Sequence, residues 1–190
     1  MIRQAKKEDA AAVISLMYTA IGDIAHTLAG TQDVGTACQV LEGFFQEKGN
    51  RISFENVLVL EEDNRVIAFM LAYHGSRAAE LDRPFLNRLA AIGSTTVSIE
   101  REAREDEYYL DSIAVHADYQ GRGIGTKLLR LFEQQAAELG HDKIMLLVDL
   151  ENKAAKALYV KMGYKEDGIV TVSGHLFNRM VKGLELETAQ

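Results

Sequence analysis

The chain has 190 residues, 47% of them hydrophobic and 26% charged, a composition typical of a globular protein with one sizeable core and not of a disordered or fibrous chain. Its formal net charge of −7 argues against a general nucleic-acid binder, and the lack of any long apolar run argues against a membrane span. A single cysteine, Cys38, excludes an internal disulfide. The first ten residues lack the apolar centre of a secretory signal, so we expect one cytoplasmic domain over residues 1–190.

The first half of the chain predicts a strand, two helices and a hairpin. A short strand is expected at residues 2–4, and apolar residues then recur at helical spacing over residues 8–20 and 37–45. The apolar runs at residues 57–60 and 66–73 flank the polar sequence Glu-Glu-Asp-Asn, which is typical of an antiparallel hairpin.

Residues 75–105 differ in composition from the rest of the chain. They hold its only proline together with five arginines and five acidic residues. We expect a surface insertion with one helix around residues 85–91. The acidic run at residues 100–107 is expected to form a solvated face; alternatively, it attracts a cationic amine.

The second half alternates strands and helices more regularly. The elements expected there, in order, are a strand at 108–115, a helix at 124–139, a strand at 144–149, a helix at 152–162 and a hairpin of residues 164–172 and 175–181. Asn152 is expected to cap the second of these helices. Six or seven strands with helices between them predict an α/β domain built on one mixed sheet.

Three alternating glycines stand between the predicted strand at 108–115 and the helix that follows it. Gly121, Gly123 and Gly125 let the backbone adopt positive φ angles and approach a ligand closely, and free N–H groups at a helix start attract an anion. Residues 121–165 carry eight Lys and Arg against five Asp and Glu, a local charge of +3. The segment predicts a phosphate or pyrophosphate cradle; alternatively, the glycines serve only a tight strand-to-helix turn.

Two nucleotide-binding motifs can be tested against this spacing. A P-loop requires a lysine directly after its last glycine, but Gly125 is followed by Thr126 and then Lys127. A dinucleotide-binding loop would use Asp149 as its ribose acid, but Gly-x-Gly-x-Gly is not its spacing, and too little chain follows to complete its sheet. An NAD-binding domain is therefore the weaker alternative.

The same segment resembles a known family. Gln120-Gly121-Arg122-Gly123-Ile124-Gly125 matches the Gln/Arg-x-x-Gly-x-Gly/Ala motif of the GNAT acyltransferase superfamily, and residues 152–164 are similar to that family's next segment, with its Asn, Tyr and Gly-Tyr landmarks. The resemblance implies the GNAT fold, a mixed sheet of six or seven strands with helices on both faces. It also implies an N-acetyltransferase that transfers the acetyl group of acetyl-CoA to a primary amine by direct attack in a ternary complex, without a metal.

The resemblance further implies which residues bind the acyl donor. When the family's binding positions are carried over to this sequence, the residues that would bind acetyl-CoA are Ile113, Ala114, Val115, Gln120, Gly121, Arg122, Gly123, Ile124, Gly125, Thr126, Asn152, Lys156 and Tyr159. The strands at 108–115 and 144–149 would splay apart to admit the pantetheine arm. The peptide N–H of Val115 would then donate to the thioester oxygen.

The resemblance also suggests the groups that move protons. Tyr159 matches the family's proton donor to the departing thiolate, and its alternative is a plain core residue, because it falls on the apolar face of its helix. Glu107, Tyr109 and Asp111 share one face of the strand by alternation. Asp111 is the first candidate for the base that deprotonates the amine and Glu107 is the second; the alternative for both is a solvated strand charge.

One competing function uses the same scaffold. A non-catalytic acyl-CoA-binding regulatory module would keep the glycine loop and acetylate no amine. The sequence does not distinguish a small-molecule acceptor from a protein amino group, and the family to which the resemblance points often forms homodimers.

Overall fold

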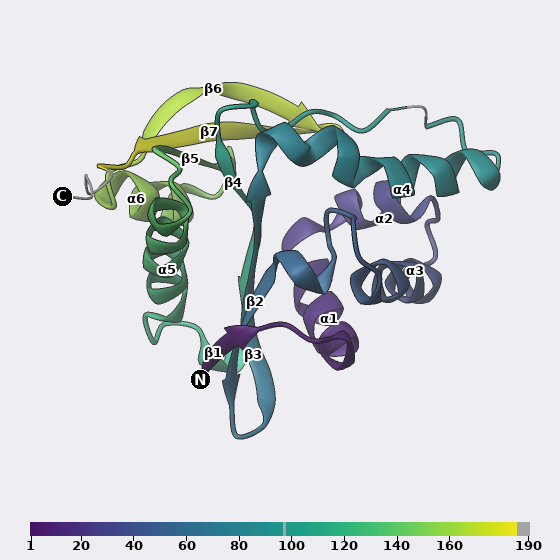
Figure 1. Ribbon diagram of the computed structural model, residues 1–190, viewed down its shortest axis with the longest axis horizontal. Helices are drawn as coiled ribbons and strands as arrows, with labels where there is room; N and C mark the ends of the chain where they lie inside the picture. Colours follow the sequence, from purple (N-terminus) through teal and green to yellow (C-terminus); the bar gives the residue numbers. More distant parts are fainter. Residues whose placement is uncertain (97, 186–190) are drawn as a thin grey trace.

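The computed structural model describes residues 1–96 and 98–185, and a seven-stranded sheet runs through it in the order β1-β2-β3-β4-β5-β7-β6 (Figure 1). The strands are β1 (Ile2–Gln4), β2 (Val57–Glu62), β3 (Arg65–His74), β4 (Tyr108–Val115), β5 (Lys143–Asp149), β6 (Lys165–Val172) and β7 (His175–Gly183). Only β4 and β5 pair in parallel; the other neighbours pair antiparallel. The predicted mixed sheet is confirmed, and β4 has the predicted bounds.

Helices cover both faces of this sheet, as Figure 1 shows. One face carries α1 (Ala10–Ile21), α2 (Asp23–Ala29), α3 (Val34–Gln46) and α4 (Ala78–Ala91), and the other carries α5 (Ile124–Glu138) and α6 (Lys153–Lys161). A separate cluster of buried apolar side chains fills each interface. Phe45 and Phe85 are fully buried on the first side and Phe132 on the second. Because strand side chains alternate between faces, the sheet contributes to both cores.

The helix predicted around residues 85–91 is wrong in extent. α4 begins at Ala78 and continues through Pro84, although proline removes one helical hydrogen bond. Its buried residues Leu81, Phe85 and Leu89 recur every four positions, so the packing of one face outweighs that local cost. The expected surface insertion therefore buries a full helical stripe.

The helix α2 was not predicted. It has only seven residues between Gly22 and Gly30, whose φ angles are +48° and +68°. A segment of this length shows too few turns for an apolar period to stand out, and an isolated helix so short is unstable without packing. Ala25, Leu28 and Ala29 are buried against its neighbours.

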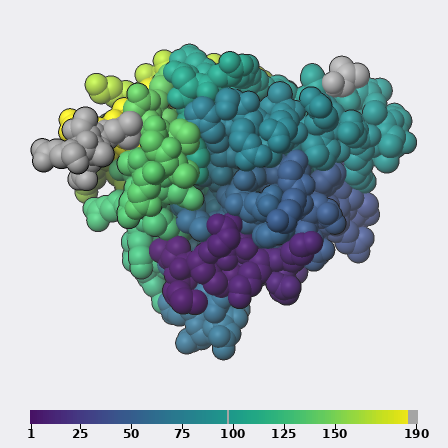
Figure 2. Space-filling model, viewed as in Figure 1, coloured from purple at the N-terminus to yellow at the C-terminus, as the bar shows by residue number. Residues whose placement is uncertain are grey.

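The N-terminal residues, purple in Figure 2, cross the lower part of the face shown there. Arg3 fixes this segment, because its Nη1 lies 2.7 Å from Asp9 Oδ2 and its Nη2 lies 2.6 Å from Glu61 Oε2. This bond to Arg3 holds the pKa of Asp9 below its usual value despite partial burial.

Among the described residues no single helix is long and apolar enough to cross a membrane, although the sharply bent pair Lys7–Ile21 and Asp23–Ala29 would match by length and composition alone.

Candidate active site

The parallel pairing of β4 and β5 stops partway along the strands. The partners are Tyr108 with Ile144 through Leu110 with Leu146, whereas β4 stays paired with β3 as far as Val115. The predicted splay is therefore present, and it begins after Leu110. Beyond that point the β5-facing edge of β4 is not paired with any strand in the described part of the chain.

A β-bulge lies at the start of the splay. Leu71 of β3 pairs with Ser112, but the next residue, Ala72, pairs with Leu110, so Asp111 is an extra residue in β4. A bulge of this kind bends the strand and exchanges the faces that its later side chains occupy. Tyr109, before the bulge, and Ala114, after it, accordingly pack on the same side of the sheet.

The backbone of β4 beyond the bulge presents hydrogen-bond donors to the opening. The N–H of His116 donates to the carbonyl of Ile67 on β3 at 2.8 Å. Because peptide groups alternate in direction along a strand, the N–H groups of Val115 and Ile113 point the other way, toward the opening between the splayed strands.

A cavity of about 520 Å³ extends from this opening to the glycine loop. Gly121 and Gly123 have φ angles of +74° and +76°, and Gly123 caps the N-terminus of α5. A side chain at either position, or at Gly125, would project into open space. The predicted left-handed glycine turn is confirmed, and it leaves unencumbered backbone and the first N–H groups of a helix facing the cavity.

Most of the predicted acetyl-CoA residues line this cavity together. They are Ile113, Ala114, Val115, Gln120, Gly121, Gly123, Ile124, Gly125, Thr126 and Tyr159.

Three predicted binding residues do not line it. Arg122 folds back over the ring of Tyr119 at 4.8 Å, and its Nη2 donates to the Asp118 carbonyl. Lys156 is paired with Glu166, with 2.6 Å between Nζ and Oε1.

Asn152 is the third predicted acetyl-CoA residue that does not line the cavity of about 520 Å³. It accepts from the N–H of Ala155 at 3.1 Å, which confirms the predicted cap, and it lines a different cavity.

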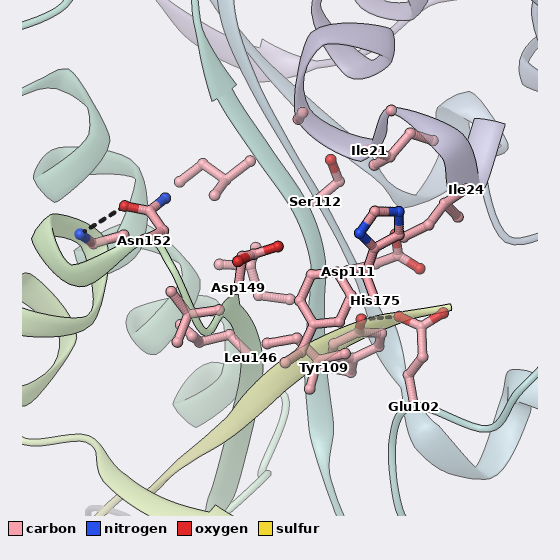
Figure 3. Close-up of a pocket in the computed structure, with 18 of the residues that line it drawn as sticks. Ile21, Ile24, Glu102, Tyr109, Asp111, Ser112, Leu146, Asp149, Asn152 and His175 are labelled. Atoms are coloured by element: carbon pink, nitrogen blue, oxygen red, sulfur yellow. Dashed lines mark hydrogen bonds between the residues drawn. The ribbon is translucent and has the colours of Figure 1, made fainter. Parts of the chain in front are cut away.

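That second cavity, of about 420 Å³, lies between β4, β5, β7 and the α1–α2 corner (Figure 3). It is acidic: Asp23, Glu102, Asp111 and Asp149 line it, whereas no lysine or arginine among the described residues does. Figure 3 shows Asp149 on the β5 side, and Asp111 and Glu102 on the other side of the cavity. Apolar walls come from Ile21, Ile24, Leu146 and Phe177. The site suits a cationic ligand with an apolar portion.

The two cavities meet at four residues, Thr19 and Ala20 of α1, Ile113 of β4 and Tyr159 of α6, which line both. Tyr159 is 9% exposed, and burial raises the pKa of its phenol. A phenol that holds its proton firmly is suited to donate a hydrogen bond or, with assistance, a proton to an anion formed at this junction.

Asp111 is held by a buried arginine. The Nη2 of Arg51 donates to Asp111 Oδ2 at 2.5 Å and to Glu102 Oε1 at 2.9 Å, and its Nη1 lies 3.4 Å from Asp82 Oδ1. The hydroxyl of Tyr73 donates to the same Asp111 oxygen at 2.7 Å. Arg51 therefore links three carboxylates that lie 31, 51 and 60 residues after it in the sequence.

Glu102 belongs to the segment that was expected to be a solvated acidic run, and that expectation is wrong for it. Its carboxylate is buried and also accepts from the Tyr109 hydroxyl (Figure 3). Burial is the largest cause that raises the pKa of Glu102, and the charge of Asp111 raises it further. An extended loop reaches this position because Gly75 lets it approach: a Cβ there would lie 1.9 Å from the Arg104 carbonyl oxygen.

Glu107, the second predicted base, lies outside both cavities. It is 0% exposed, and its Oε1 lies 2.5 Å from Arg179 Nη2 and 3.4 Å from Lys143 Nζ. Its other oxygen accepts from the Arg104 N–H at 2.7 Å. The structure therefore gives Glu107 a role in fixing the loop before β4, and the strand alternation that grouped it with Asp111 does not bring it to the cavity.

Sequence reasoning missed Arg51, Glu102 and the residues of the α1–α2 corner. None stands in a motif, and each joins the site through contacts with distant segments. The one available signal was the excess of acids in residues 100–107, which does not separate a buried carboxylate from a solvated one.

Comparison with known proteins shows to which family a chain with this sequence and fold is similar. A model of the acetyltransferase (GNAT) family matches residues 31–164. The N-acetyltransferase YycN of Bacillus subtilis (strain 168) is 27% identical over 85 residues, 45% of this chain and 54% of YycN, so the chain spans about half of that relative. The ribosomal protein bS18-alanine N-acetyltransferase of Salmonella typhimurium is 34% identical over 106 residues, 53% of this chain and 68% of the relative.

A solved structure agrees over nearly the whole chain. The crystal structure of an N-acetyltransferase from Staphylococcus aureus Mu50 has a TM-score of 0.81 at 28% identity, covering 96% of this chain and 100% of that one. The strand splay, the glycine loop at the start of α5 and these similarities agree with one another. The chain belongs to the GNAT acetyltransferase family.

Proposed function

We propose that this protein transfers an acetyl group from acetyl-CoA to the primary amine of a cationic acceptor, by direct attack in a ternary complex. One observation carries the proposal: a cavity bordered by the glycine loop and an acidic cavity meet at Tyr159 and Ile113, at the splay of β4 and β5. Such a junction brings a donor from one side and an acceptor from the other to the same point.

The cavity of about 520 Å³ is the proposed acetyl-CoA site. Backbone N–H groups between Gly121 and Thr126 would hold the pyrophosphate, since the left-handed turn and the start of α5 direct donors outward. The pantetheine arm would pair with the free edge of β4 as an added strand. The proposed contacts with Arg122 and Lys156 would require both side chains to leave their present partners.

The geometry favours Ile113 over Val115 as donor to the thioester oxygen. Both N–H groups point into the opening, but Ile113 lines both cavities and Val115 lines only the acetyl-CoA cavity. We therefore assign the Ile113 N–H to the oxyanion that develops during attack, and the Val115 N–H to the pantetheine arm.

Asp111 remains the proposed base, because it lines the acidic cavity and its Oδ2 is anchored by Arg51 and Tyr73. An anchored carboxylate is held in position to take a proton from the incoming ammonium group. Tyr159 is the proposed proton donor to the CoA thiolate. The acidic lining supports a cationic acceptor, and the apolar walls at Ile21 and Phe177 support one that carries hydrocarbon next to its amine.

A free-CoA release assay tests the proposal. Purified protein with acetyl-CoA would be given butylamine, butane-1,4-diamine, 2-phenylethylamine, lysine and an alanyl peptide in turn, with mass spectrometry to identify the acetylated product. We expect amine-dependent CoA release for at least one of them and thermal stabilisation by acetyl-CoA.

Stabilisation by acetyl-CoA without turnover of any amine would instead indicate the non-catalytic binding module. Absence of stabilisation by acetyl-CoA would contradict the assignment of the cavity.

A further inference from the structure

The buried carboxylates around Arg51 exceed the positive charge available to them. We define the Arg51 cluster as Arg51, Tyr73, Asp82, Glu102, Tyr109 and Asp111. One guanidinium faces three carboxylates, so the cluster carries a charge of −2 when all three are ionised. Buried uncompensated charge is unfavourable, and the cluster is therefore a place where an added proton is stabilised.

The directions of the pKa shifts within the cluster follow from its geometry. Burial is the largest cause raising the pKa of both Asp82 and Glu102, and the charge of Asp111 raises the pKa of each further. Arg51 acts in the opposite direction on both. The remaining titratable groups of the cluster are the phenols of Tyr73 and Tyr109, which donate hydrogen bonds to Asp111 and Glu102, respectively.

Two further cations lie near the cluster. Arg101, the neighbour of Glu102 in the chain, is exposed and paired with Glu105, with 3.2 Å between Nη2 and Oε1. Arg179 of β7 donates to the backbone carbonyl of Glu102 at 2.6 Å, but its guanidinium is already paired with Glu107. Across the acidic cavity, Asp23 is paired with His175 at 2.9 Å. Arg51 is thus the only cation paired with the three carboxylates of the cluster in the described part of the chain.

The cluster separates the acidic cavity from a third cavity of about 150 Å³. Glu102 lines both. Arg51, Tyr73 and Asp82 line the third cavity but not the acidic one, whereas Asp111 lines only the acidic one. The third cavity also has exposed residues at its wall, among them Ser76, Glu100 and Glu105. Glu102 therefore stands between the proposed acceptor site and a second route to solvent.

We propose that Glu102 carries the acceptor's proton away from the site, from Asp111 to the third cavity, and that Asp82 is a positioning residue that sets its proton affinity. The inference rests on the proposed acetyl transfer. The acceptor ammonium gives one proton to Asp111, and its free amine attacks the thioester. A second proton from the same nitrogen ends on the CoA thiolate, so each turnover releases one proton, and Glu102 passes that proton to water in the third cavity.

Asp82 offers a clean test because it does not border the acidic cavity. Asp82→Asn removes one negative charge from the cluster while keeping the shape of the side chain. The acidic limb of the kcat/KM profile, measured with the best acceptor among the five amines, should move to lower pH by on the order of one unit. The matched control is Asp63→Asn, which removes an exposed charge in the β2–β3 turn and should leave the profile in place.

Glu102→Gln supplies an independent variant. It keeps the hydrogen-bonding shape but holds no transferable proton, so kcat should fall at least tenfold while the Kd of acetyl-CoA stays within twofold of wild type. Coincident pH profiles for wild type, Asp82→Asn and Asp63→Asn, or an unchanged kcat in Glu102→Gln, would overturn the inference and leave the acetyl transfer standing.

A titration of the wild-type protein needs neither an acceptor nor a variant. Carbon-13 NMR of labelled carboxyl groups, in the presence of acetyl-CoA, should show Glu102 titrating above the ordinary glutamate value of about 4.3. A normal midpoint would overturn the inference even if no amine in the panel is acetylated. A raised midpoint of Glu102 without turnover of any amine would instead contradict the proposed acetyl transfer and not the raised proton affinity of Glu102.

Discussion

Tyr159 lies at the junction of the two cavities, and the contribution of its hydroxyl to catalysis can be measured by removing only that oxygen. Tyr159→Phe keeps the ring in the core and removes the proposed proton donor, so kcat should fall by about 10²-fold, the lower range for general acid catalysis. The Kd of acetyl-CoA, measured by calorimetry, should stay within twofold of wild type. Unchanged turnover would remove Tyr159 from the mechanism.

A neighbouring tyrosine provides the control for that experiment. The ring of Tyr164 lies 6.0 Å from that of Tyr159, is buried in the same core and lines neither cavity. Tyr164→Phe should leave kcat unchanged. A similar loss in both variants would mean that the core around α6 had been disturbed and not that a proton donor had been lost.

Ser112 carries a buried hydroxyl that has no hydrogen-bond partner in the described part of the chain. An unsatisfied buried hydroxyl costs stability. Ser112→Ala should therefore leave the free energy of unfolding unchanged or raise it by up to about 1 kcal/mol, as measured by urea denaturation. Destabilisation by more than that amount would show that the hydroxyl has a partner in solution.

Residues in local motifs were predictable, and residues joined by distant contacts were not. The turn at Gly121 and Gly123 and the cap at Asn152 follow from neighbours within a few positions, and the structure confirms them. Arg51 reaches Glu102 and Asp111 across 51 and 60 residues. No local pattern encodes such a contact, because it depends on how the loop before β4 folds back onto the sheet.

At the scale of elements, strong periodicity identified the strands and the long helices, whereas local packing decided the rest. α5 and β4 show clear patterns and have nearly the expected bounds. α2 and the first half of α4 form because neighbouring elements cover them. The bulge at Asp111 was not predicted either, because an alternation of side chains between the two faces along residues 108–115 assumes regular pairing with the neighbouring strand.

The loop that carries Glu102 depends on close approach to Gly75. A methyl group there would lie 1.9 Å from the Arg104 carbonyl oxygen, and the Gly75 N–H also bonds to the Glu107 carbonyl at 2.7 Å. Gly75→Ala should lower the free energy of unfolding by about 1–3 kcal/mol, as overpacking usually does, and should reduce kcat/KM for the acceptor while leaving the Kd of acetyl-CoA near wild type.

Gly43 in α3 is the matched control for this variant. It lies in a helix, and an added Cβ would meet no atom within 4 Å. Gly43→Ala should raise stability slightly, because alanine favours the helical backbone more than glycine does. Equal losses in the two variants would show that the approach of the loop to β3 is not the cause.

At the scale of the whole molecule, the class of fold could be predicted from the sequence, but the order of the strands in the sheet could not. Alternating apolar runs and helices predict a mixed sheet, and the resemblance around residues 108–165 gave the family. The pairing of β5 with β7, which places β6 at the edge, depends on long-range registers. Those registers also determine that Phe177 and His175 border the acidic cavity.

The pH dependence of stability should reflect the two kinds of carboxylate in the molecule. The pKa values of Asp82 and Glu102 are raised in the folded protein, so the folded state binds more protons than the unfolded state above their ordinary values of about 4. Stability therefore falls as pH rises through the window up to the raised values. Asp106 has the opposite sign: its bond to Lys143 lowers its pKa, so its contribution is present above about pH 4 and is lost only below.

Asp82→Asn and Asp106→Asn should consequently behave differently in urea denaturation at pH 5 and pH 8. Asp82→Asn removes a carboxylate whose ionisation is unfavourable in the folded state, so its stability relative to wild type should increase from pH 5 to pH 8. Asp106→Asn loses a favourable interaction that is fully present at both values, so its deficit should be the same at each. A difference for Asp82→Asn that does not change with pH would mean that Arg51 fully compensates the three carboxylates, and the cluster would then hold no excess charge.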